Sequence, residues 1–452
     1  MATTDGTAEP DRYRLFSVEH SYFSAKVRAY LRWKDHHGAL PGGFEDVLAT
    51  TDLIRDLLTV RSGSPSLPQL EAPDGTWVQD TSSIIDFVEE ANPEPPVVPP
   101  ASTSPRQCLV SYLLEMLGDE WMLVMACWQR WQHTVEDGAG SHRAHNEQQW
   151  GSWLAPERPG PERRAAGADF FEKVFGISAA RSEPKGPFAG LVDLGVDETT
   201  IGAWTASQDR LLDRLETHFG IHDYLLGGAP SLADFSLLGP LYVHYYRDAG
   251  PGYRLRTAYP LVAEWVERTN RESALNARWY GQRLYSLDPD SGALVGRPAT
   301  SDGGALLPDD EIPESLLAII EIFFDEMWPV LRSSAAALAK FIASDRHQAG
   351  AELPRKSFTA TPGFLEHQTA NGALTHEFVL HGVRGRRMVV PYQIWMLQRL
   401  ADVVASCTVD VVQRAAVESM LARWPRGTEL LRVDDLLAGC RIRKEGGLLF
   451  SV

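Results

Sequence analysis

The chain has 452 residues, more than one hydrophobic core normally organises, so we expect two or three domains. Apolar residues make up 44% of it and charged residues 23%, a balance typical of globular proteins that excludes a disordered chain. The 60 acidic residues outnumber the 43 Lys and Arg residues, and the formal net charge of −17 opposes binding to nucleic acid and to anionic lipid surfaces.

Four elements are predicted near the N-terminus. They are a strand, a helix, a hairpin and a second helix, over residues 13–18, 21–34, 66–78 and 84–90. Apolar side chains recur at helical spacing in the first helix, and Asp74-Gly75 is a strong signal for a tight turn between two strands. Thr81-Ser82-Ser83 begins the second helix, which ends before the Pro-rich segment 92–105. This order predicts a small α+β domain.

The next part of the chain is predicted to be all-helical. Its helical segments are residues 107–131, 169–175, 199–219, 235–246 and 260–269. Large apolar residues recur along the first of them, as is typical of a long buried helix. Ser231-Leu232-Ala233-Asp234 matches the capping box that starts a helix. The segment 288–313, rich in Gly, Pro and Asp, is predicted to be a linker.

A third region follows, with signals for helices and hairpins. It contains two predicted helices and two predicted hairpins, over residues 314–344, 392–404, 376–390 and 440–452. The turns are expected at Arg384-Gly385 and at Glu445-Gly446-Gly447. Arg384, Arg386 and Arg387 form a basic cluster in the first hairpin. The cluster fits binding of an anionic substrate, and a solvated hairpin tip explains it as well or better.

Three short motifs of the N-terminal part resemble the glutathione S-transferase superfamily, in the order found there. They are Ser21-Tyr22-Phe23-Ser24-Ala25-Lys26-Val27-Arg28, Leu67-Pro68 and Gln79-Asp80-Thr81-Ser82. The family's first motif is Ser or Cys, Pro, an aromatic residue, Ser or Cys, any residue, Lys or Arg, and Val. The chain departs from it at Tyr22, where the family has Pro. The resemblance includes the helical domain and leaves the region after residue 285 without a counterpart.

The resemblance implies that Ser21 meets the sulfur atom of glutathione. A thiol attacks as its thiolate, and a hydroxyl donor at a helix N-terminus favours that anion. Serine forms no mixed disulfide, so this residue favours a transferase over thiol exchange. Considered without the family, Ser21 is a helix N-cap, and Ser24 is the alternative sulfur donor.

The other two motifs are expected to hold the tripeptide. Pro68 stands where the family has a cis-proline, and the resemblance implies that the backbone of Leu67 pairs with the cysteine part of glutathione. Asp80 and Thr81 stand where the family holds the γ-glutamyl carboxylate, and Asp80 is expected to accept from the ligand's ammonium group. Structural explanations exist as well, because Pro68 fits an edge strand or turn and Asp80 or Thr81 fits a helix cap.

The resemblance implies that the second substrate lies between the two domains, beside the long first helix. The candidates for that wall are five residues of the helix: Tyr112, Glu115, Asp119, Trp121 and Trp128. Aromatic residues at helical spacing are more often core than pocket. Near the sulfur site, Tyr13 is expected to pack within its strand and His20 to lie at the surface.

The spacing of the cysteines is informative about metal binding, and the N-terminal segment is informative about the location of the protein in the cell. The four cysteines lack any CxxC spacing or nearby His cluster, which predicts reduced structural thiols and no metal: Cys108, Cys127, Cys407 and Cys440. The first 20 residues lack a basic start followed by an apolar stretch, and no run of 18 apolar residues occurs elsewhere. We therefore expect a cytoplasmic protein without a membrane partner.

The sequence thus predicts an α+β protein with a thioredoxin-like domain over residues 12–97, an all-helical domain over 105–285 and a mixed α/β extension over 308–452. The resemblance implies a homodimer that uses glutathione as co-substrate against a hydrophobic electrophilic small molecule, as in detoxification. Conjugation, substitution, ether cleavage and isomerisation all fit. The alternative is a non-catalytic binding or scaffold protein that keeps the fold.

Overall fold

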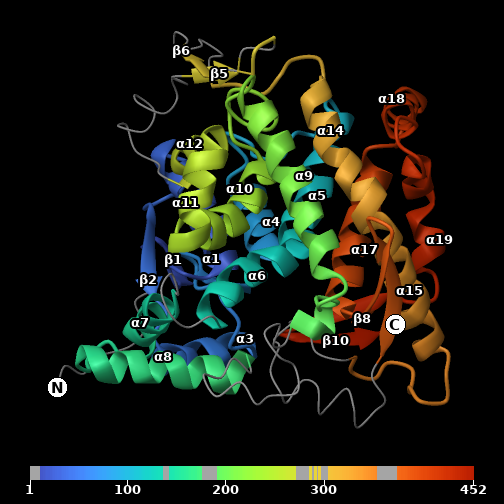
Figure 1. The fold of residues 1–452 in the computed structure, drawn as a ribbon. Helices are drawn as coiled ribbons and strands as arrows, with labels where there is room; N and C mark the ends of the chain where they lie inside the picture. The colour runs from blue at the N-terminus through green and yellow to red at the C-terminus, as the bar shows by residue number, and fades with distance from the viewer. Residues whose placement is uncertain are drawn as a thin grey trace.

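The computed structural model describes residues 11–135, 142–175, 191–270, 285–287, 290–292, 294–296, 304–353 and 374–452. Figure 1 shows an N-terminal sheet with its helices in blue, a helical part in cyan to yellow, and a C-terminal extension in orange and red. The predicted fold class, α+β with an added mixed region, is confirmed.

The N-terminal part is built on a four-stranded sheet with the order β2-β1-β3-β4. The strands are β1 (Tyr13–Ser17), β2 (Phe44–Leu48), β3 (Gln69–Glu71) and β4 (Trp77–Gln79). β1 pairs in parallel with β2 and antiparallel with β3, and β4 completes the predicted hairpin. β2 was not predicted, because this edge strand is partly exposed and carries no continuous apolar run.

Helices cover both faces of this sheet, because successive side chains of β1 point to opposite faces. They are α1 (Tyr22–His36), α2 (Thr51–Leu53), the π-helical turn η1 (Ile54–Leu58), α3 (Thr59–Ser62) and α4 (Thr81–Ala91). Leu15 joins the large core with Val27 of α1 and Ile84 of α4. Phe16 instead packs with Leu58 of η1 in a second, smaller core. The sheet therefore fixes the starts of α1 and α4, where the candidate site lies.

The middle part is helical, as predicted, with two helices that the sequence did not reveal, α7 and α11. Its elements are α5 (Pro105–Met116), the π-helical turn η2 (Leu117–Trp121), α6 (Met122–Val135), α7 (Arg143–Leu154), α8 (Gly160–Phe175), α9 (Ile201–Phe219), α10 (Leu232–Pro240), the π-helical segment η4 (Leu241–Tyr246), α11 (Ala249–Ala258) and α12 (Pro260–Asn270). The single long helix expected over 107–131 is interrupted by η2, which inserts a wider turn between α5 and α6.

The predicted capping box at the start of α10 is present. The Asp234 carboxylate is fully buried and accepts from the backbone N–H of Ser231 at 2.9 Å. It also accepts from Leu225 N–H and from Trp265 Nε1, each at 3.0 Å. The Ser231 hydroxyl donates to it as well, at 2.9 Å, and because these four donors satisfy the carboxylate, it can lie in the core of the helical part.

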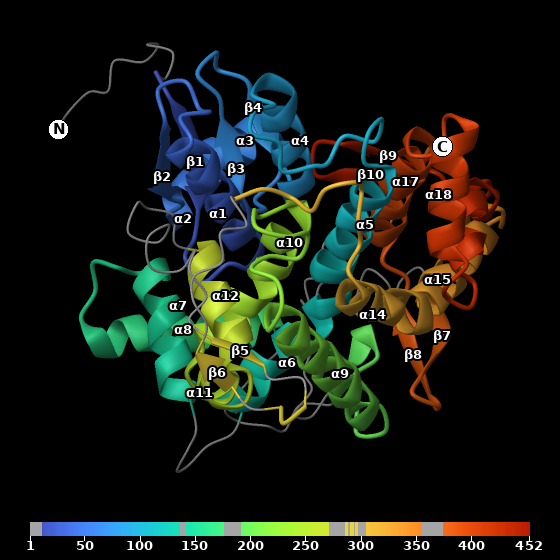
Figure 2. The same ribbon diagram turned by 90° about the horizontal axis from the view of Figure 1, so that it is seen from above.

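The extension packs α14 on α9 and α17 on α5. Its elements are α14 (Glu314–Ile322), η5 (Phe323–Met327), α15 (Trp328–Ile342), β7 (Thr375–Leu380), β8 (Val383–Met388), α17 (Pro391–Ser406), α18 (Val411–Leu421), the 3₁₀ segment η6 (Gly427–Arg432), α19 (Val433–Leu437), β9 (Ile442–Glu445) and β10 (Leu448–Ser451). Before the extension lie two short strands that pair with each other, β5 (Tyr285–Leu287) and β6 (Leu294–Gly296). Figure 2 shows the red β9–β10 hairpin reaching toward α4 of the N-terminal part. Part of the expected linker 288–313 lies outside the described residues, and its residues 294–296 form the unpredicted strand β6.

The turn of the β7–β8 hairpin lies at His381-Gly382, so its expected place at Arg384-Gly385 is wrong. His381 and Gly382 have φ values of 48° and 79°, the left-handed pair that suits a two-residue hairpin turn. Gly385 instead lies inside β8, and its Cα faces the ring of Phe378. This shift moves the three arginines away from the hairpin tip.

The structure also bears on the expectations about membrane-spanning segments and about the cysteines. None of the helices in the described ranges is long and apolar enough to cross a membrane. All four cysteines are buried and free.

Candidate functional site

A cavity of about 360 Å³ lies where the three parts of the chain meet. The N-terminal part contributes Val18, His20, Ser21, Phe23, Ile54, Pro65, Ser66, Leu67, Gln79, Asp80 and Thr81 to its lining. The helical part contributes Glu120, Leu123, Val124, Trp150, Trp153 and Leu194, and the extension contributes Arg387, Val390, Tyr392 and Gln393. The lining is mainly apolar with a few polar groups, as is usual for a small-molecule site.

Ser21 is the N-cap of α1 and also lines the cavity. Its Oγ accepts from the backbone N–H of Ser24 at 3.3 Å. The hydroxyl proton of Ser21 has no acceptor among the described residues. Ser21 therefore caps α1 and lines the cavity at the same time, and its hydroxyl can still donate a hydrogen bond to a ligand.

Ser24, the alternative donor, does not line the cavity. It is fully buried, and its Oγ accepts from the backbone N–H of Val18 at 3.3 Å. Tyr22, which replaces the family's Pro, is also buried and donates its hydroxyl to the backbone C=O of Gly118. Both side chains hold α1 in place and leave Ser21 as the serine of this motif that faces the cavity.

Leu67 lines the cavity, whereas Pro68 is buried behind it. The Leu67–Pro68 peptide bond is cis, as the resemblance implied. No described residue forms a hydrogen bond with the backbone N–H or C=O of Leu67. An extended peptide group in the cavity therefore finds a donor and an acceptor here.

Asp80 and Thr81 lie at the start of α4, and both line the cavity although each is buried to at least nine-tenths. Asp80 is the N-cap, and its Oδ1 accepts from the backbone N–H of Ser82 at 3.2 Å. Its φ of 97° is a conformation that a side chain disfavours, and such strain is typically found at functional sites. The expected cap is therefore present, in an unusual conformation.

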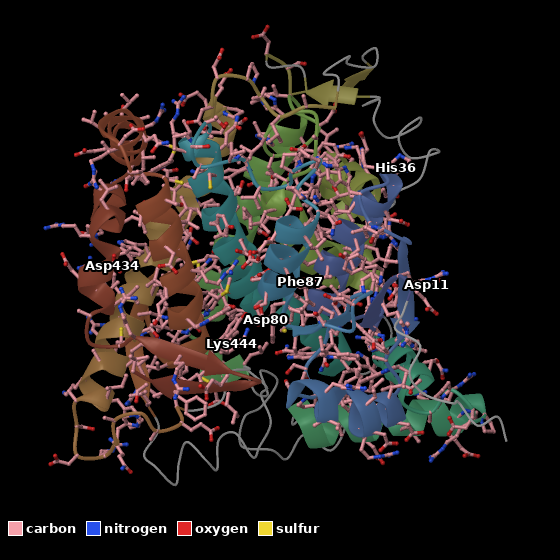
Figure 3. All side chains as sticks on the ribbon, turned by 180° about the vertical axis from the view of Figure 1, so that it is seen from behind. Asp11, His36, Asp80, Phe87, Asp434 and Lys444 are labelled. Carbon is pink, nitrogen blue, oxygen red and sulfur yellow. The ribbon has the colours of Figure 1, made fainter. Side chains whose placement is uncertain are left out.

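The extension completes the surroundings of Asp80. Its Oδ2 accepts from the hydroxyl of Tyr392 at 2.6 Å and lies 3.0 Å from Nζ of Lys444 on β9. Figure 3 shows Asp80 and Lys444 side by side, the first from the N-terminal part and the second from the C-terminal hairpin. Sequence reasoning missed Tyr392 and Lys444, because no local pattern connects a distant hairpin to this helix start.

His20 lies beside Ser21 and is buried, so the expectation that it is exposed is wrong. Trp150 and Trp153 cover it, with ring centroids 4.4 and 5.6 Å from the imidazole. Both belong to α7, a helix that the sequence did not predict. Burial, and next the charge of Arg130, lowers the pKa of His20 well below its usual range, so the ring is neutral at pH 7.

Tyr13 packs within its strand, as expected, and its hydroxyl accepts from Nδ2 of Asn92 at 2.9 Å. It does not line the cavity. Of the two residues considered beside the sulfur site, only His20 therefore faces the ligand space.

The helical wall of the cavity is formed by Glu120, Leu123 and Val124. None of the five residues expected there lines it: Tyr112, Glu115, Asp119, Trp121 and Trp128. The π-helical turn η2 explains the error for the positions within and after it, because one extra residue rotates them by about 100° around the helix axis. A regular helical spacing continued through η2 therefore predicts the wrong residues for the cavity wall. Tyr112 and Glu115 precede this turn, in α5, which packs against α17 of the extension.

Glu115 and Asp119 instead form a buried ion-pair cluster with Lys26 of α1. The Nζ of Lys26 lies 2.8 Å from Glu115 Oε1 and 2.6 Å from Asp119 Oδ2. Glu115 Oε1 also accepts from the hydroxyl of Ser82 at 2.7 Å. The cluster joins the starts of α1 and α4 to α5 and η2, and so holds the N-terminal and helical sides of the cavity together.

Arg387 is the one arginine of the basic cluster that reaches the cavity. It is 2% exposed and lines the wall with Gln393. Arg384 and Arg386 are exposed, paired with Glu377 at 3.2 Å and with Thr375 Oγ1 at 2.7 Å. Arg384 and Arg386 are therefore solvated side chains along β8, away from the hairpin tip, and Arg387 is the buried member of the cluster.

In the described part of the chain, no group of three or more His, Cys, Asp or Glu side chains is suited to hold a metal ion.

Two family models match the chain. Residues 15–96 match the model described as Glutathione S-transferase, N-terminal domain, and residues 179–268 match Glutathione S-transferase, C-terminal domain. None of the curated proteins compared with the chain matches it.

Several solved structures are similar in part. A glutathione S-transferase from Rhodospirillum rubrum F11 is 16% identical with a TM-score of 0.33, over 64% of this chain and 97% of that one. The beta-etherase LigF from Sphingobium sp. strain SYK-6 is 18% identical with a TM-score of 0.37, over 58% and 96%. A glutathione S-transferase from Methylobacterium radiotolerans, in complex with glutathione sulfonate, is 21% identical with a TM-score of 0.29, over 60% and 92%. These likenesses are too weak to carry an argument.

Proposed function

Residues 15–96 and 179–268 belong to the glutathione S-transferase superfamily, and from this premise we propose that the cavity beside Ser21 binds glutathione. The bound thiolate attacks a hydrophobic, electrophilic small molecule, so that the chain is a glutathione transferase-like enzyme. The reaction is a conjugation, a substitution, an ether cleavage or an isomerisation.

The observation that supports the proposal is that Ser21, Leu67 and Thr81 line the same cavity. Ser21 and Thr81 lie at the N-terminal ends of α1 and α4, where the helix dipole and free N–H groups favour anions. Leu67 offers its backbone N–H and C=O. A thiolate, a carboxylate and a peptide group are the corresponding parts of glutathione.

The proposed chemistry starts with a hydrogen bond from the Ser21 hydroxyl to the glutathione sulfur, while the thiol proton leaves to solvent. The sulfur donates an electron pair to the electrophilic carbon, and a C–S bond forms. In a substitution or an ether cleavage the leaving group departs with its bonding pair. In an addition the pair of the attacked double bond moves to the neighbouring atom, which takes up a proton. In an isomerisation the sulfur leaves again with the C–S electron pair.

Asp80 and Thr81 hold the γ-glutamyl end in this proposal. Thr81 and the start of α4 bind its carboxylate, and Asp80 accepts from its ammonium group. The ammonium of Lys444 already lies 3.0 Å from the Asp80 carboxylate. The ligand's ammonium therefore competes with Lys444 for this oxygen.

The same ion pair favours a second candidate function, a non-catalytic binding or scaffold role. Lys444 belongs to the chain itself and places beside Asp80 the positive charge that the ammonium group of a ligand would otherwise supply. In addition, a fold alone does not fix an activity. Titration calorimetry with millimolar glutathione, followed by a turnover assay, separates the two candidates. Absence of binding rejects the transferase and supports the scaffold, and binding without turnover supports a non-catalytic binding protein.

Turnover of Ser21→Ala tests the proposed sulfur contact. We expect kcat/KM with glutathione and 1-chloro-2,4-dinitrobenzene to fall about 100-fold, as when one donor to a reacting anion is removed. Asp410→Ala is the matched control, because it removes an N-cap of α18 that does not line the cavity. Ser24→Ala tests the alternative donor. Wild-type turnover in Ser21→Ala contradicts the assignment.

The proposal also includes a homodimer, a cytoplasmic location and domains over residues 12–97, 105–285 and 308–452. Sedimentation of the full chain at micromolar concentration tests the first of these. A monomer removes dimerisation from the proposal and leaves the cavity unaffected.

A further inference from the structure

Arg387 is a buried guanidinium on the wall of the cavity without a counter-ion. It is 2% exposed, and its Nε and Nη1 donate no hydrogen bond. Nη2 has one long contact, 3.4 Å to Oε1 of Gln393. No carboxylate of a described residue lies within 4.0 Å of the guanidinium.

The described residues around Arg387 position it without a direct ion pair. Gln393 accepts from Nη2 and donates through Nε2 to the backbone C=O of Glu120 at 3.3 Å. His376 is its cross-strand partner in the β7–β8 hairpin and is 6% exposed. Burial raises the pKa of Glu120 well above its usual range, although the charge of Arg387 lowers it. Burial lowers the pKa of Arg387 to about 10, which leaves it charged at pH 7.

A buried charge is strongly unfavourable unless it is paired and hydrogen-bonded. The chain has 60 acidic residues against 43 basic ones, yet none of those described pairs with Arg387. The unpaired nitrogens belong to a side chain that lines the cavity. The missing anion is therefore expected to arrive with the ligand.

We propose that Arg387 binds a carboxylate of the second substrate, so that the protein takes small, apolar electrophiles that carry a carboxylate group. Guanidinium and carboxylate form strong, charge-assisted hydrogen bonds, and the low polarity of the cavity strengthens their attraction. This inference rests on the proposed function, because a second substrate presupposes the first.

The position of Arg387 favours the second substrate over glutathione. Gln393 joins it to Glu120 of η2, and a Cβ on Gly195 would lie 3.3 Å from its own Cβ. Arg387 is thus attached to the helical side of the cavity. Ser21 and Thr81 line the N-terminal side. The extension therefore supplies specificity at the wall that faces the electrophile.

Two matched electrophiles test the inference, 4-chloro-3-nitrobenzoate and 4-chloro-3-nitrobenzamide. Glutathione displaces chloride from the same carbon in both, and only the first carries a carboxylate. The variants are Arg387→Met, Arg387→Lys and the control Arg386→Met, which alters the exposed neighbour on the same strand. KM and kcat are measured for each electrophile and for glutathione.

We expect Arg387→Met to raise KM for the benzoate roughly tenfold or more, as when a hydrogen bond to a charged group is lost. KM for the benzamide and for glutathione stays unchanged, Arg386→Met matches the wild type, and Arg387→Lys recovers part of the affinity. Equal effects on benzoate and benzamide overturn the inference. So does a raised KM for glutathione alone, which assigns Arg387 to a carboxylate of the tripeptide.

Binding of the benzoate without glutathione separates this inference from the proposed function. Thermal shifts that occur in the wild type and are lost in Arg387→Met support the carboxylate site even where glutathione fails to bind. Glutathione binding without any preference for the benzoate overturns the carboxylate site and leaves the transferase. Because Arg387 has no internal counter-ion, ligand-free Arg387→Met is expected to melt no lower than the wild type. A lower melting temperature contradicts the inference.

Discussion

The ammonium of Lys444 lies 3.0 Å from the Oδ2 atom of Asp80 and joins the end of the chain to the start of α4. Lys444 is 10% and Asp80 3% exposed in their side chains, so the pair is buried. Tyr392 donates to the same oxygen. The extension is therefore part of the candidate site and is not an appendage beside it.

Removal of the ammonium is expected to affect stability and ligand binding in opposite directions. Lys444→Met removes the ammonium that lies 3.0 Å from the buried Asp80 carboxylate, and we expect a loss of about 3 kcal/mol in the free energy of unfolding. The ligand's ammonium then replaces Lys444, so millimolar glutathione raises the melting temperature of this variant more than that of the wild type. Arg443→Met, on the same strand and exposed, is the control. Equal shifts contradict the competition.

A glycine substitution tests the packing of η2, which carries Glu120 to the cavity wall. A Cβ on Gly118 would lie 2.7 Å from the backbone oxygen of Ser236 in α10, so the backbones must separate. We expect Gly118→Ala to lower the free energy of unfolding by about 2 kcal/mol. Gly202→Ala on α9 meets nothing within 4 Å and is expected to change it by less than about 1 kcal/mol. Urea unfolding measures both, and similar values disprove this packing.

Acid is expected to destabilise the extension through His376. Burial, and next the Arg387 charge, lowers the pKa of His376 to about 3. Since its unfolded pKa is about 6.5, the neutral ring contributes stability above that pH, and the contribution is lost as the pH falls toward the folded value. Between pH 6.5 and 5 the loss amounts to about 2 kcal/mol.

Urea unfolding of His376→Leu at several pH values checks this contribution. The variant is expected to lose less stability than the wild type between pH 6.5 and 5. His37→Leu, an exposed site, is the control. Parallel pH profiles for the wild type and His376→Leu refute a buried neutral ring.

Local signals in the sequence were sufficient for most of the N-terminal part. The turn at Asp74-Gly75 and the cap at Ser21 depend on a few neighbouring residues, and both are present in the structure. The cis bond at Pro68 followed from the resemblance. Ser21, Leu67, Asp80 and Thr81 are brought together around one cavity, and their roles toward glutathione stay predictions.

The remaining wall could not be predicted, because it depends on packing between distant segments. Lys444 and Tyr392 reach Asp80 only when the extension folds against α4 and α5. The role of Arg387 was left open between anion binding and a solvated hairpin tip, because Arg384-Gly385 was expected to form the turn. His381-Gly382 is the alternative turn, and it places Arg387 opposite the buried His376.

Proton release on glutathione binding tests the role of Ser21 most directly. A free thiol, with a pKa near 8.5, is mostly protonated at pH 7, so binding as the thiolate releases a proton. Calorimetric titrations in two buffers of different ionisation enthalpy measure that release. We expect the wild type to release close to one proton per site and Ser21→Ala to bind with much less release. Binding without proton release, or equal release in both proteins, would contradict a sulfur contact at Ser21.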